Sequence, residues 1–387
     1  TSYIASMLRP EVIRDLALAD HGLRMVPCEP ALLVPFPDGD AVRWWPERER
    51  TLAELRRYSP RDAATFARVD DRLKKLARYL QPFFLEPPPQ VDGRGLAGLM
   101  ELLRAGKRFR GISGEEIGQM VSFLTGSLGE FLDRNFEHEK VKTLMLANSV
   151  YGKHGGPYQP GTAMGLLFHL LSGGEHETQG FYGHVIGGMG AITQALASSA
   201  RKLGAEIRTS APVAKVVVRN GRVQGVALED GSELRSALVL SNADPKRTFL
   251  GLVDASDLPD DFRAAVRGIR MDGPCAKVNL VLGEEPRVAR PSSAATPSAA
   301  SPSERALFTL TPTLEGAERC YDAAKYGEIP EELWVDCVVA SNVDSTLAPV
   351  GKHILTCFVQ YVPYRLRSGT WDEKRELLGD RVLKKMA

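Results

Sequence analysis

A glycine-rich run that leads directly into a helix constrains this fold more than any other feature of the chain. The run is Gly187-Gly188-Met189-Gly190, and a predicted helix follows over residues 189–203. The free amides and the dipole at a helix N-terminus favour an anion, and glycine lets a ligand approach the backbone closely. A tight turn without a ligand is the more common role of such a loop, so both interpretations stay open on this run alone.

The residues after this helix predict a three-stranded antiparallel ribbon. Its apolar, strand-length runs are separated by Asn220-Gly221 and Asp230-Gly231, dipeptides that favour tight hairpin turns. A return strand, LVLSN, is predicted over residues 238–242, and in an open α/β sheet ligands lie at the carboxyl ends of strands. An ordinary ribbon with a core strand is the alternative. The small and polar residues at the end of the return strand are Ser241, Asn242 and Ala243.

The first half of the chain changes from strands to helices. Residues 1–46 predict a helix over 9–18 and two or three short strands, with a hairpin turn at Asp38-Gly39-Asp40. Residues 47–180 are mostly helical. Ser59 before Pro60 marks one helix start, and Ser113 with Glu116 fits a capping box at another.

The last third of the chain predicts a sheet and a final helix. Apolar strands are expected over residues 276–282, 333–340 and 353–361, and a helix is expected from Trp371. A Pro/Ala/Ser tract over residues 291–304 cannot pack a core, so we expect a surface loop there.

The composition excludes several classes of protein. Lys and Arg total 49 and Asp and Glu total 48, so a net charge of +1 lacks the basic excess of a nucleic-acid-binding protein. The five cysteines show neither CxxC nor zinc-ligand spacing, so we expect no metal site and buried free thiols in a reducing compartment. These cysteines are Cys28, Cys275, Cys320, Cys337 and Cys357.

The uncharged run over residues 180–200 is long enough to cross a bilayer but contains several glycines and polar residues. We therefore expect a soluble, cytoplasmic protein. The chain begins close to one helical pattern and stops inside another, and we interpret it as a fragment of a longer protein.

Four runs in order resemble the phytoene-desaturase-like branch of the flavin-dependent amine oxidase superfamily. They are GGMGAITQALASSARKLGAEI, APVAKVVV, GRVQGVALEDG and LVLSNADPKRTFL, and further similar runs such as SYIASMLRPEVIRDLALADHGLR and VDSTLAPVGKHILTCFVQYVPY lie near the two ends. The resemblance implies an α/β fold: part of an FAD/NAD(P)-binding domain of the glutathione-reductase type, with a helical and antiparallel-sheet substrate domain.

The same resemblance implies FAD as the cofactor and assigns residues to it. The main chain at Val213 would meet the adenine, Ser241, Asn242 and Ala243 would lie near the cofactor, and Gly187, Gly188 and Met189 would start the helix that re-enters the FAD domain. The implied domains are the start of the substrate domain (1–46), a helical substrate domain (47–180), an FAD-domain segment (181–255) and a substrate-domain sheet with the final helix (256–387).

Two features of the family pattern are absent from this sequence. Neither the opening GxGxxG nor the closing glycine-rich segment against the flavin is present. A fragment would explain both losses, so we expect the intact protein to bind FAD and these 387 residues to bind it weakly or not at all.

The function implied is that of an FAD-dependent oxidoreductase, dehydrogenase-like or desaturase-like, which moves a hydride from an apolar, isoprenoid-like substrate to the flavin. Because the flavin performs this chemistry, no acid/base pair is required and no catalytic residue is assigned. The alternative is a non-redox FAD-fold protein with a structural or interaction role, and a nicotinamide reductase is a weaker third option. We expect a small apolar substrate and no nucleic acid, and leave contact with a membrane surface or a second copy open.

Several polar or aromatic residues are weaker candidates for the site. Lys277 lies in an apolar strand, and an outward-facing lysine is favoured over one that lines a cavity. The favoured roles are a structural histidine for His184, core packing for Tyr361 and Tyr364, and a loop position without assigned function for His154. The helices over residues 62–168 are expected to form a core rather than a substrate tunnel.

Overall fold

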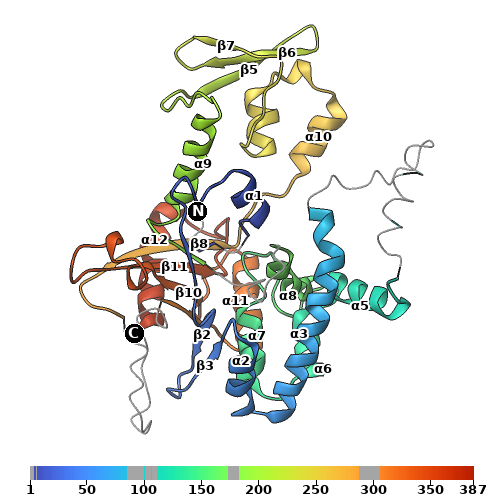
Figure 1. Ribbon diagram of the computed structural model, residues 1–387, viewed down its shortest axis with the longest axis vertical. Helices are drawn as coiled ribbons and strands as arrows, with labels where there is room; N and C mark the ends of the chain where they lie inside the picture. Colours follow the sequence, from blue (N-terminus) through green and yellow to red (C-terminus); the bar gives the residue numbers. More distant parts are fainter. Residues whose placement is uncertain are drawn as a thin grey trace. The chain divides into compact units, whose positions relative to one another are not determined.

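The chain forms two compact units, seen in the computed structural model of Figure 1. The first contains residues 1–199 and 273–387, and the second contains residues 200–272. The structure describes residues 4–5, 7–84, 100, 106, 111–172, 183–286 and 306–387, so the predicted loop over 291–304 lies outside the described residues. The division into four domains implied by the resemblance stays a prediction.

The first unit is built around an antiparallel sheet of four strands in the order β8-β11-β10-β9. Three of these strands match those expected from the sequence, whereas β9 was not expected. Their bounds are β8 Cys275–Leu282, β9 Leu307–Leu310, β10 Trp334–Val339 and β11 His353–Gln360.

The final helix, α12 (Trp371–Met386), covers one face of this sheet (Figure 1). It begins with a capping box between Thr370 and Glu373, as a sequence with Thr three residues before Glu favours. Leu378 and Val382 of α12 pack against the apolar residues of β10 and β11 that point to this face, so the helix and the sheet share one core. The strand residues are Val335, Cys337, Val339, Leu355, Cys357 and Val359.

Helices form the second core of the first unit. In α3 (Pro60–Leu80), the side chain of Ser59 accepts a hydrogen bond from the amide of Asp62, and Pro60 occupies the first turn, as expected. Ser113 and Glu116 form the expected capping box of α5. The other helices are α2 Arg48–Arg56, α5 Gly114–Thr125, α6 Leu128–Asn135, α7 Glu139–Ala147, α8 Gly165–Phe168 and α11 Leu314–Lys325.

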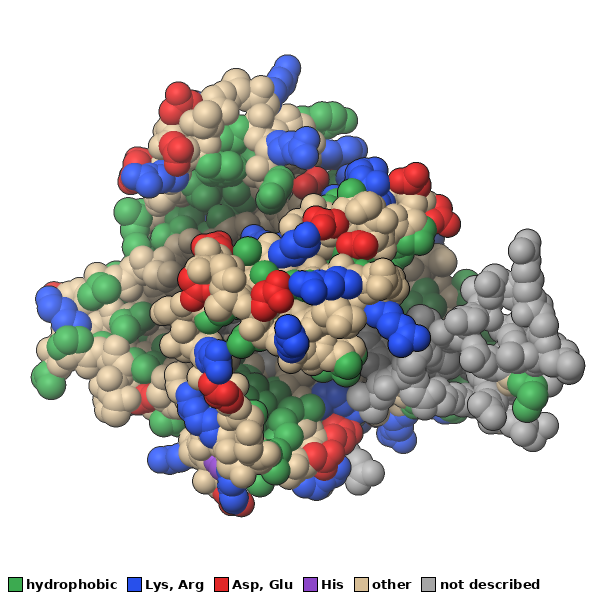
Figure 2. Space-filling model, turned by 90° about the horizontal axis from the view of Figure 1, so that it is seen from above, with side chains coloured by type: hydrophobic (Ala, Val, Ile, Leu, Met, Phe, Trp, Pro, Cys, Tyr) green, Lys and Arg blue, Asp and Glu red, His purple; other side chains and the backbone are tan. Residues whose placement is uncertain are grey.

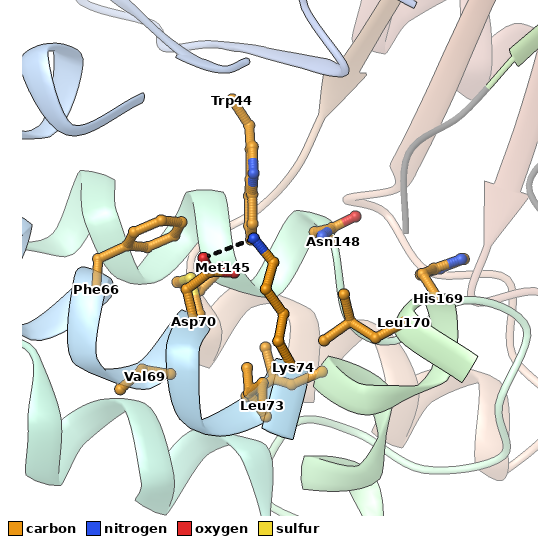
Figure 3. A pocket seen from close by; sticks show the side chains of 11 residues that line it. Trp44, Phe66, Val69, Asp70, Leu73, Lys74, Met145, Asn148, His169 and Leu170 are labelled. Carbon is orange, nitrogen blue, oxygen red and sulfur yellow. Dashed lines mark hydrogen bonds and ion pairs between the residues drawn. The ribbon is translucent and has the colours of Figure 1, made fainter. Parts of the chain in front are cut away.

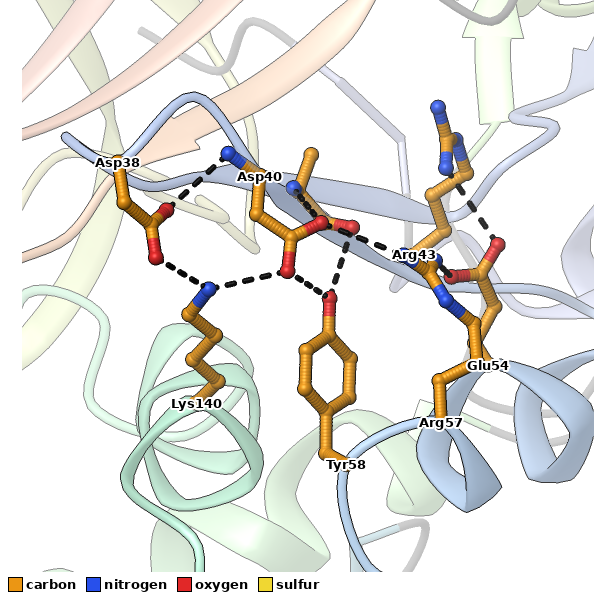
Figure 4. A network of polar contacts seen from close by, with 8 residues as sticks. Asp38, Asp40, Arg43, Glu54, Arg57, Tyr58 and Lys140 are labelled. Atoms are coloured by element: carbon orange, nitrogen blue, oxygen red, sulfur yellow. Dashed lines mark hydrogen bonds and ion pairs between the residues drawn. The ribbon is translucent and has the colours of Figure 1, made fainter. Parts of the chain in front are cut away.

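Strands β2 (Leu32–Pro35) and β3 (Ala41–Trp44) pair as a hairpin, which confirms the expected turn. Ion pairs link this turn to α7 (Figure 4). Nζ of Lys140 lies 2.6 Å from Asp38 and 2.9 Å from Asp40, and the Tyr58 hydroxyl donates to Asp40. Partial burial would raise the pKa of Asp40, but hydrogen bonds from Lys140 and Tyr58 outweigh it and lower the pKa to about 2.

A separate small sheet leads to the glycine-rich loop. Here β1 (Met25–Pro27) pairs antiparallel with β4 (Gly183–Val185), and α9 (Gly190–Lys202) follows, close to the helix expected from the sequence. The first helix, α1 (Pro10–Asp15), is shorter than the pattern suggested. Val185, Ala195 and Leu18 belong to the small apolar core that holds β4, α9 and the segment after α1 together.

The second unit contains the predicted ribbon, with strands in the order β5-β6-β7. Both expected turns are present, and Asn220 and Gly221 have φ of 53° and 71°, as a tight hairpin turn requires. The strands are β5 Val213–Arg219, β6 Arg222–Leu228 and β7 Glu233–Arg235, followed by a π-helical segment, Arg247–Leu252, and α10, Asp260–Gly268. Among the described residues of both units, no helix combines the length and apolar character that a bilayer span needs.

Candidate functional site

The glycine-rich loop connects β4 to α9 through two residues in the left-handed region. Gly187 and Gly188 have φ of 83° and 77°, which residues with a Cβ adopt only with strain. An added Cβ at Gly188 would lie 3.6 Å from Cδ2 of Leu347. The backbone conformation therefore requires both glycines, whether or not a ligand binds here.

A carboxylate of the protein itself lies at this loop. The amide of Gly187 donates to Oδ2 of Asp344 at 2.6 Å, and Thr346 donates to Oδ1 through its amide and its hydroxyl. The hydrogen bond from Gly187 is the main reason that the pKa of Asp344 is lowered. The Gly187 amide, just before α9, is thus already occupied by a carboxylate of the chain itself.

The other expected cofactor residues lie in and after the ribbon. Val213 is the first residue of β5 and pairs with Leu228. Ser241 lies 2.8 Å from the hydroxyl of Thr248, oxygen to oxygen, and accepts a hydrogen bond from the amide of Ala243. Ser241 and Asn242 are exposed, so their polar groups are accessible to solvent or to a ligand.

The predicted return strand over residues 238–242 is wrong. The segment forms no ladder with any strand in the described ranges. Its apolar side chains are open to solvent, with Leu238 70% and Leu240 88% exposed. The pattern indicated a buried strand, but a strand exists only where a neighbour accepts its backbone hydrogen bonds, and the described part of the chain supplies none here.

The expected cofactor residues are divided between the two units. Gly187, Gly188 and Met189 belong to the first unit, whereas Val213, Ser241, Asn242 and Ala243 belong to the second. Their assignment to one FAD site therefore stays a prediction.

A row of four residues crosses the large sheet of the first unit. Lys277 of β8 lies opposite Phe358 of β11, Phe358 lies opposite Asp336 of β10, and Asp336 lies opposite Thr309 of β9. Because directly opposed residues point to the same face, this row lies on the face away from α12. Lys277 is half-buried rather than fully outward-facing, and burial lowers its pKa.

Asp336 is the acidic residue of this row, and its surroundings change its pKa strongly. It is fully buried, and its Oδ1 accepts hydrogen bonds from the Thr309 hydroxyl at 2.7 Å and from the Trp334 indole at 3.2 Å. Its Oδ2 is buried with no hydrogen-bond partner among the described residues. Burial raises the pKa of Asp336 to about 7, because the two hydrogen bonds only partly offset the loss of water. A carboxyl group that titrates near neutrality can hold or release a proton.

Sequence reasoning missed Asp336 and Thr309, although a signal was present. Asp336 is the one charged residue in the apolar run LWVDCVVA, and a charge in the middle of a buried strand is rare unless it is paired or functional.

The loop after α7 packs against this sheet through Gln360 and Tyr361. Gln360 is buried, accepts from the amide of Gly152 at 3.0 Å and donates to the carbonyl of Val150 at 2.7 Å. The buried hydroxyl of Tyr361 donates to the carbonyl of Gly155 at 2.8 Å, so this tyrosine is a core residue.

The remaining candidates are not brought together. Tyr364 is exposed and does not share the core position of Tyr361, and His154 is exposed on its loop. His184 is buried on β4, where burial lowers its pKa to about 4, and its Nε2 has no hydrogen-bond partner among residues that the structure describes. None of these residues adds an acid or base to the row on the sheet.

A small cavity in the helical core is shown in Figure 3. Its volume is about 40 Å³, whereas one water needs about 10–15 Å³ on the same measure. The cavity therefore has room for a few water molecules and not for an isoprenoid chain. Its lining is mostly apolar, with the ion pair of Asp70 and Lys74 at one side, and consists of Trp44, Phe66, Val69, Asp70, Leu73, Lys74, Met145, Asn148, Leu166, His169 and Leu170.

Charged side chains of both signs are mixed on the face drawn in Figure 2. The described residues on that face show no area covered by Lys and Arg alone, in keeping with a net charge of +1. The absence of a nucleic-acid partner stays a prediction.

Comparison with known proteins gives the family. Residues 29–328 match the family described as flavin containing amine oxidoreductase. Pyridine nucleotide-disulfide oxidoreductase domain-containing protein 2 of Mus musculus is 31% identical over 394 residues, covering 97% of this chain and 67% of the mouse protein. From the motifs quoted in the sequence analysis we predict that, within the phytoene-desaturase-like branch, the chain is most like this protein. The 31% identity over nearly the whole chain confirms that prediction.

More distant similarity extends to carotenoid enzymes. Phytoene desaturase (neurosporene-forming) of Rhodobacter capsulatus is 26% identical over 239 residues, covering 62% of this chain and 41% of that protein. The crystal structure of a Pyrococcus furiosus protein is similar in fold, with a TM-score of 0.53 at 12% identity, and covers 99% of this chain and 71% of that one. The family match spans most of the chain, and the relation to the mouse protein spans nearly all of it, so this chain belongs to the flavin containing amine oxidoreductase family.

Proposed function

We propose that this chain is part of an FAD-dependent oxidoreductase that removes a hydride from an apolar, isoprenoid-like substrate. The observation that carries the proposal is the family match over residues 29–328, which makes the chain a member of a flavin-dependent oxidoreductase family. The substrate class is supported by the names of two relatives, phytoene desaturase of Rhodobacter capsulatus and prolycopene isomerase of Daucus carota, because phytoene and prolycopene are apolar polyenes.

The described residues fit part of an FAD site. An added Cβ at Gly190 would meet open space, so the first turn of α9 is accessible, and Ser241 and Asn242 are exposed. The Gly187 amide does not fit, because it already donates to Asp344. We propose that Val213, Ser241, Asn242, Ala243, Gly188 and Met189 contact the cofactor, and that a contact at Gly187 uses atoms other than this amide.

Bound FAD would supply the hydride acceptor, and the protein would supply binding, orientation and exclusion of water. Phe358 and the aliphatic stem of Lys277 provide apolar surface on the sheet face away from α12. Asp336 on the same face holds a proton near neutral pH but lies below the surface, so it acts on its neighbours rather than on substrate.

Anaerobic reduction tests the redox proposal. The intact protein, of which this chain is a part, is loaded with FAD and mixed with phytoene in detergent micelles, with squalane, a saturated chain of similar polarity, as the matched control. We expect phytoene and not squalane to remove the visible absorbance of the flavin. Stable FAD binding without bleaching by phytoene, together with a stable protein complex, would instead favour a structural or interaction role.

The cofactor residues are tested separately by FAD titration of the intact protein. Asn242→Leu is expected to weaken FAD binding at least tenfold, because it removes polar groups at the proposed contact. Ser232→Ala, in the exposed turn between β6 and β7, is the control and should leave the affinity unchanged. Equal affinities in the two variants would contradict the assignment of Asn242.

A further inference from the structure

Two cysteines face each other across the large sheet. Cys337 of β10 lies directly opposite Cys357 of β11, and both side chains are fully buried on the face covered by α12. Their sulfur atoms are 4.0 Å apart. The two residues are 20 positions apart in sequence, so no short motif announces the pair.

The backbone already has the spacing that a disulfide needs. Directly opposed residues of antiparallel strands have Cα atoms about 4.5 or about 5.5 Å apart, depending on their place in the ladder. Both values fall within the roughly 4.4–6.8 Å that disulfides span. The sulfur atoms can therefore approach by side-chain rotation, without a change in strand register.

The other three cysteines lack this arrangement. The thiol of Cys320 donates to the carbonyl of Glu332, and the structure shows no sulfur atom beside Cys28, Cys275 or Cys320 within the ranges it describes. Burial raises the pKa of Cys275 and of Cys320 to about 12, which leaves almost no reactive thiolate at neutral pH. These cysteines serve as internal controls. Within the pair, the contact with Cys357 and burial raise the pKa of Cys337, whereas the contact with Cys337 lowers the pKa of Cys357, so Cys357 supplies the attacking thiolate.

We propose that Cys337 and Cys357 form a reversible disulfide that links β10 to β11. The oxidant is a small disulfide such as oxidised glutathione. One cysteine thiolate attacks the small disulfide, which forms a mixed disulfide and releases one small thiol. The second cysteine then attacks the mixed disulfide and releases the second small thiol. Two S–H bonds and one S–S bond break, one S–S bond and two S–H bonds form, and two electrons pass from the cysteines to the oxidant.

A turn of α12 lies against the pair. The sulfur of Met386 lies 3.9 Å from the sulfur of Cys357, so this turn covers the thiol. Local opening of a single helix costs less free energy than global unfolding. We expect Val382→Ala, which removes a buried contact of α12, to accelerate disulfide formation, and Leu383→Ala, on the exposed side of α12, to leave the rate unchanged.

The experiment equilibrates the native protein in glutathione buffers of increasing oxidised fraction. After acid quenching, the thiols are alkylated under denaturing conditions and peptides are identified by mass spectrometry. We expect Cys337 and Cys357 to lose reactivity together as one linked pair, while Cys28, Cys275 and Cys320 remain alkylated. The oxidised protein should have an unfolding constant roughly a hundredfold smaller, because the link closes a loop of about 20 residues.

Single substitutions provide the second readout. In Cys357→Ala, Cys337 should remain alkylated or carry glutathione, and Cys320→Ala should behave as the unmodified protein. The proposal is overturned if both cysteines stay alkylated in the most oxidising buffer while the unfolded chain oxidises fully, or if Cys337 pairs with other cysteines equally often. The wild-type measurement decides the question even if a variant fails to fold.

Discussion

The large four-stranded sheet and the ribbon are built from similar sequences but differ in how they are covered. Every side chain of β10 and half of those of β11 are buried, whereas β5 and β6 of the ribbon leave most of theirs at least partly exposed. Both regions are rich in Val and Leu. The difference teaches that apolar alternation predicts strands, while the elements that pack against them decide how much stability each side chain adds.

Polar groups follow the same contrast. The large sheet contains a carboxyl group away from water at Asp336, and the ribbon has an ion pair at the surface between Lys215 and Asp254. A buried polar group changes the free energy of unfolding strongly, and an exposed pair changes it little. Substitutions in the two regions should therefore have very different effects.

The largest effect is expected for Leu355→Ala. Leu355 is fully buried between the sheet and α12, so its truncation should destabilise the first unit by about 2–5 kcal/mol. Val281→Ala on β8, where the side chain is 76% exposed, is the control and should cost below about 0.5 kcal/mol. Urea unfolding followed by tryptophan fluorescence checks both, because all four tryptophans lie in the first unit. Equal costs would break the comparison.

The next effect concerns the pH dependence given by Asp336. Its pKa is about 7 in the folded protein against 3.8 for an unperturbed Asp, so between these values the folded state binds more protons than the unfolded state. Stability should fall as pH rises from about 4 to about 7 and stay level above that, by on the order of 2–4 kcal/mol. Asp336→Asn should remove this fall and be more stable than the wild type at pH 8. An unchanged pH profile in the variant would show that other groups cause the dependence.

A smaller effect is expected for Gly225→Ala in the ribbon. Gly225 has φ of 137°, and an added Cβ would lie 1.9 Å from the carbonyl oxygen of Leu234 on β7, so β6 and β7 must separate. We expect a loss of about 1–3 kcal/mol, measured as faster hydrogen exchange in β6 and β7. Gly221→Ala has a positive φ but open space around it, and should cost about 1 kcal/mol. Protection lost equally in both variants would contradict the steric argument.

The smallest effect is expected for Leu240→Ser. The side chain is 88% exposed, so replacing it removes almost no buried apolar area, and the free energy of unfolding should change by less than about 0.5 kcal/mol. Hydrogen exchange of the second unit should be unchanged. A loss above about 1 kcal/mol would show that this segment is covered in solution and that the contrast with the large sheet is smaller than described.

Local signals in the sequence predicted most elements of the fold. The Asn-Gly and Asp-Gly turns predicted where the strands of the ribbon end. The caps at Ser59 and Ser113 predicted where two helices begin. Both kinds of signal depend on neighbouring residues alone. The return strand at Leu238 and Leu240 failed for the opposite reason. A strand needs a partner from elsewhere in the chain, and no local pattern shows whether that partner is present.

The candidate site was harder to predict than the fold. The glycine loop was recognised, but not the carboxylate of Asp344, which lies 157 residues further along the chain. The row of Lys277, Phe358, Asp336 and Thr309 comes from four strands whose register is set by tertiary packing. Only Lys277 attracted notice in the sequence, since a single charge in a strand has no visible partner until the strands are paired.

The hydrogen bond from the Gly187 amide to Asp344 means that a free anion approaching this loop must compete with a carboxylate of the chain. Both groups belong to one folded chain, so the carboxylate competes as an intramolecular ligand, with an effective concentration on the order of millimolar or higher. A dilute phosphate that meets this amide alone loses the competition. Any ligand that takes this amide must gain contacts elsewhere to offset the displaced carboxylate.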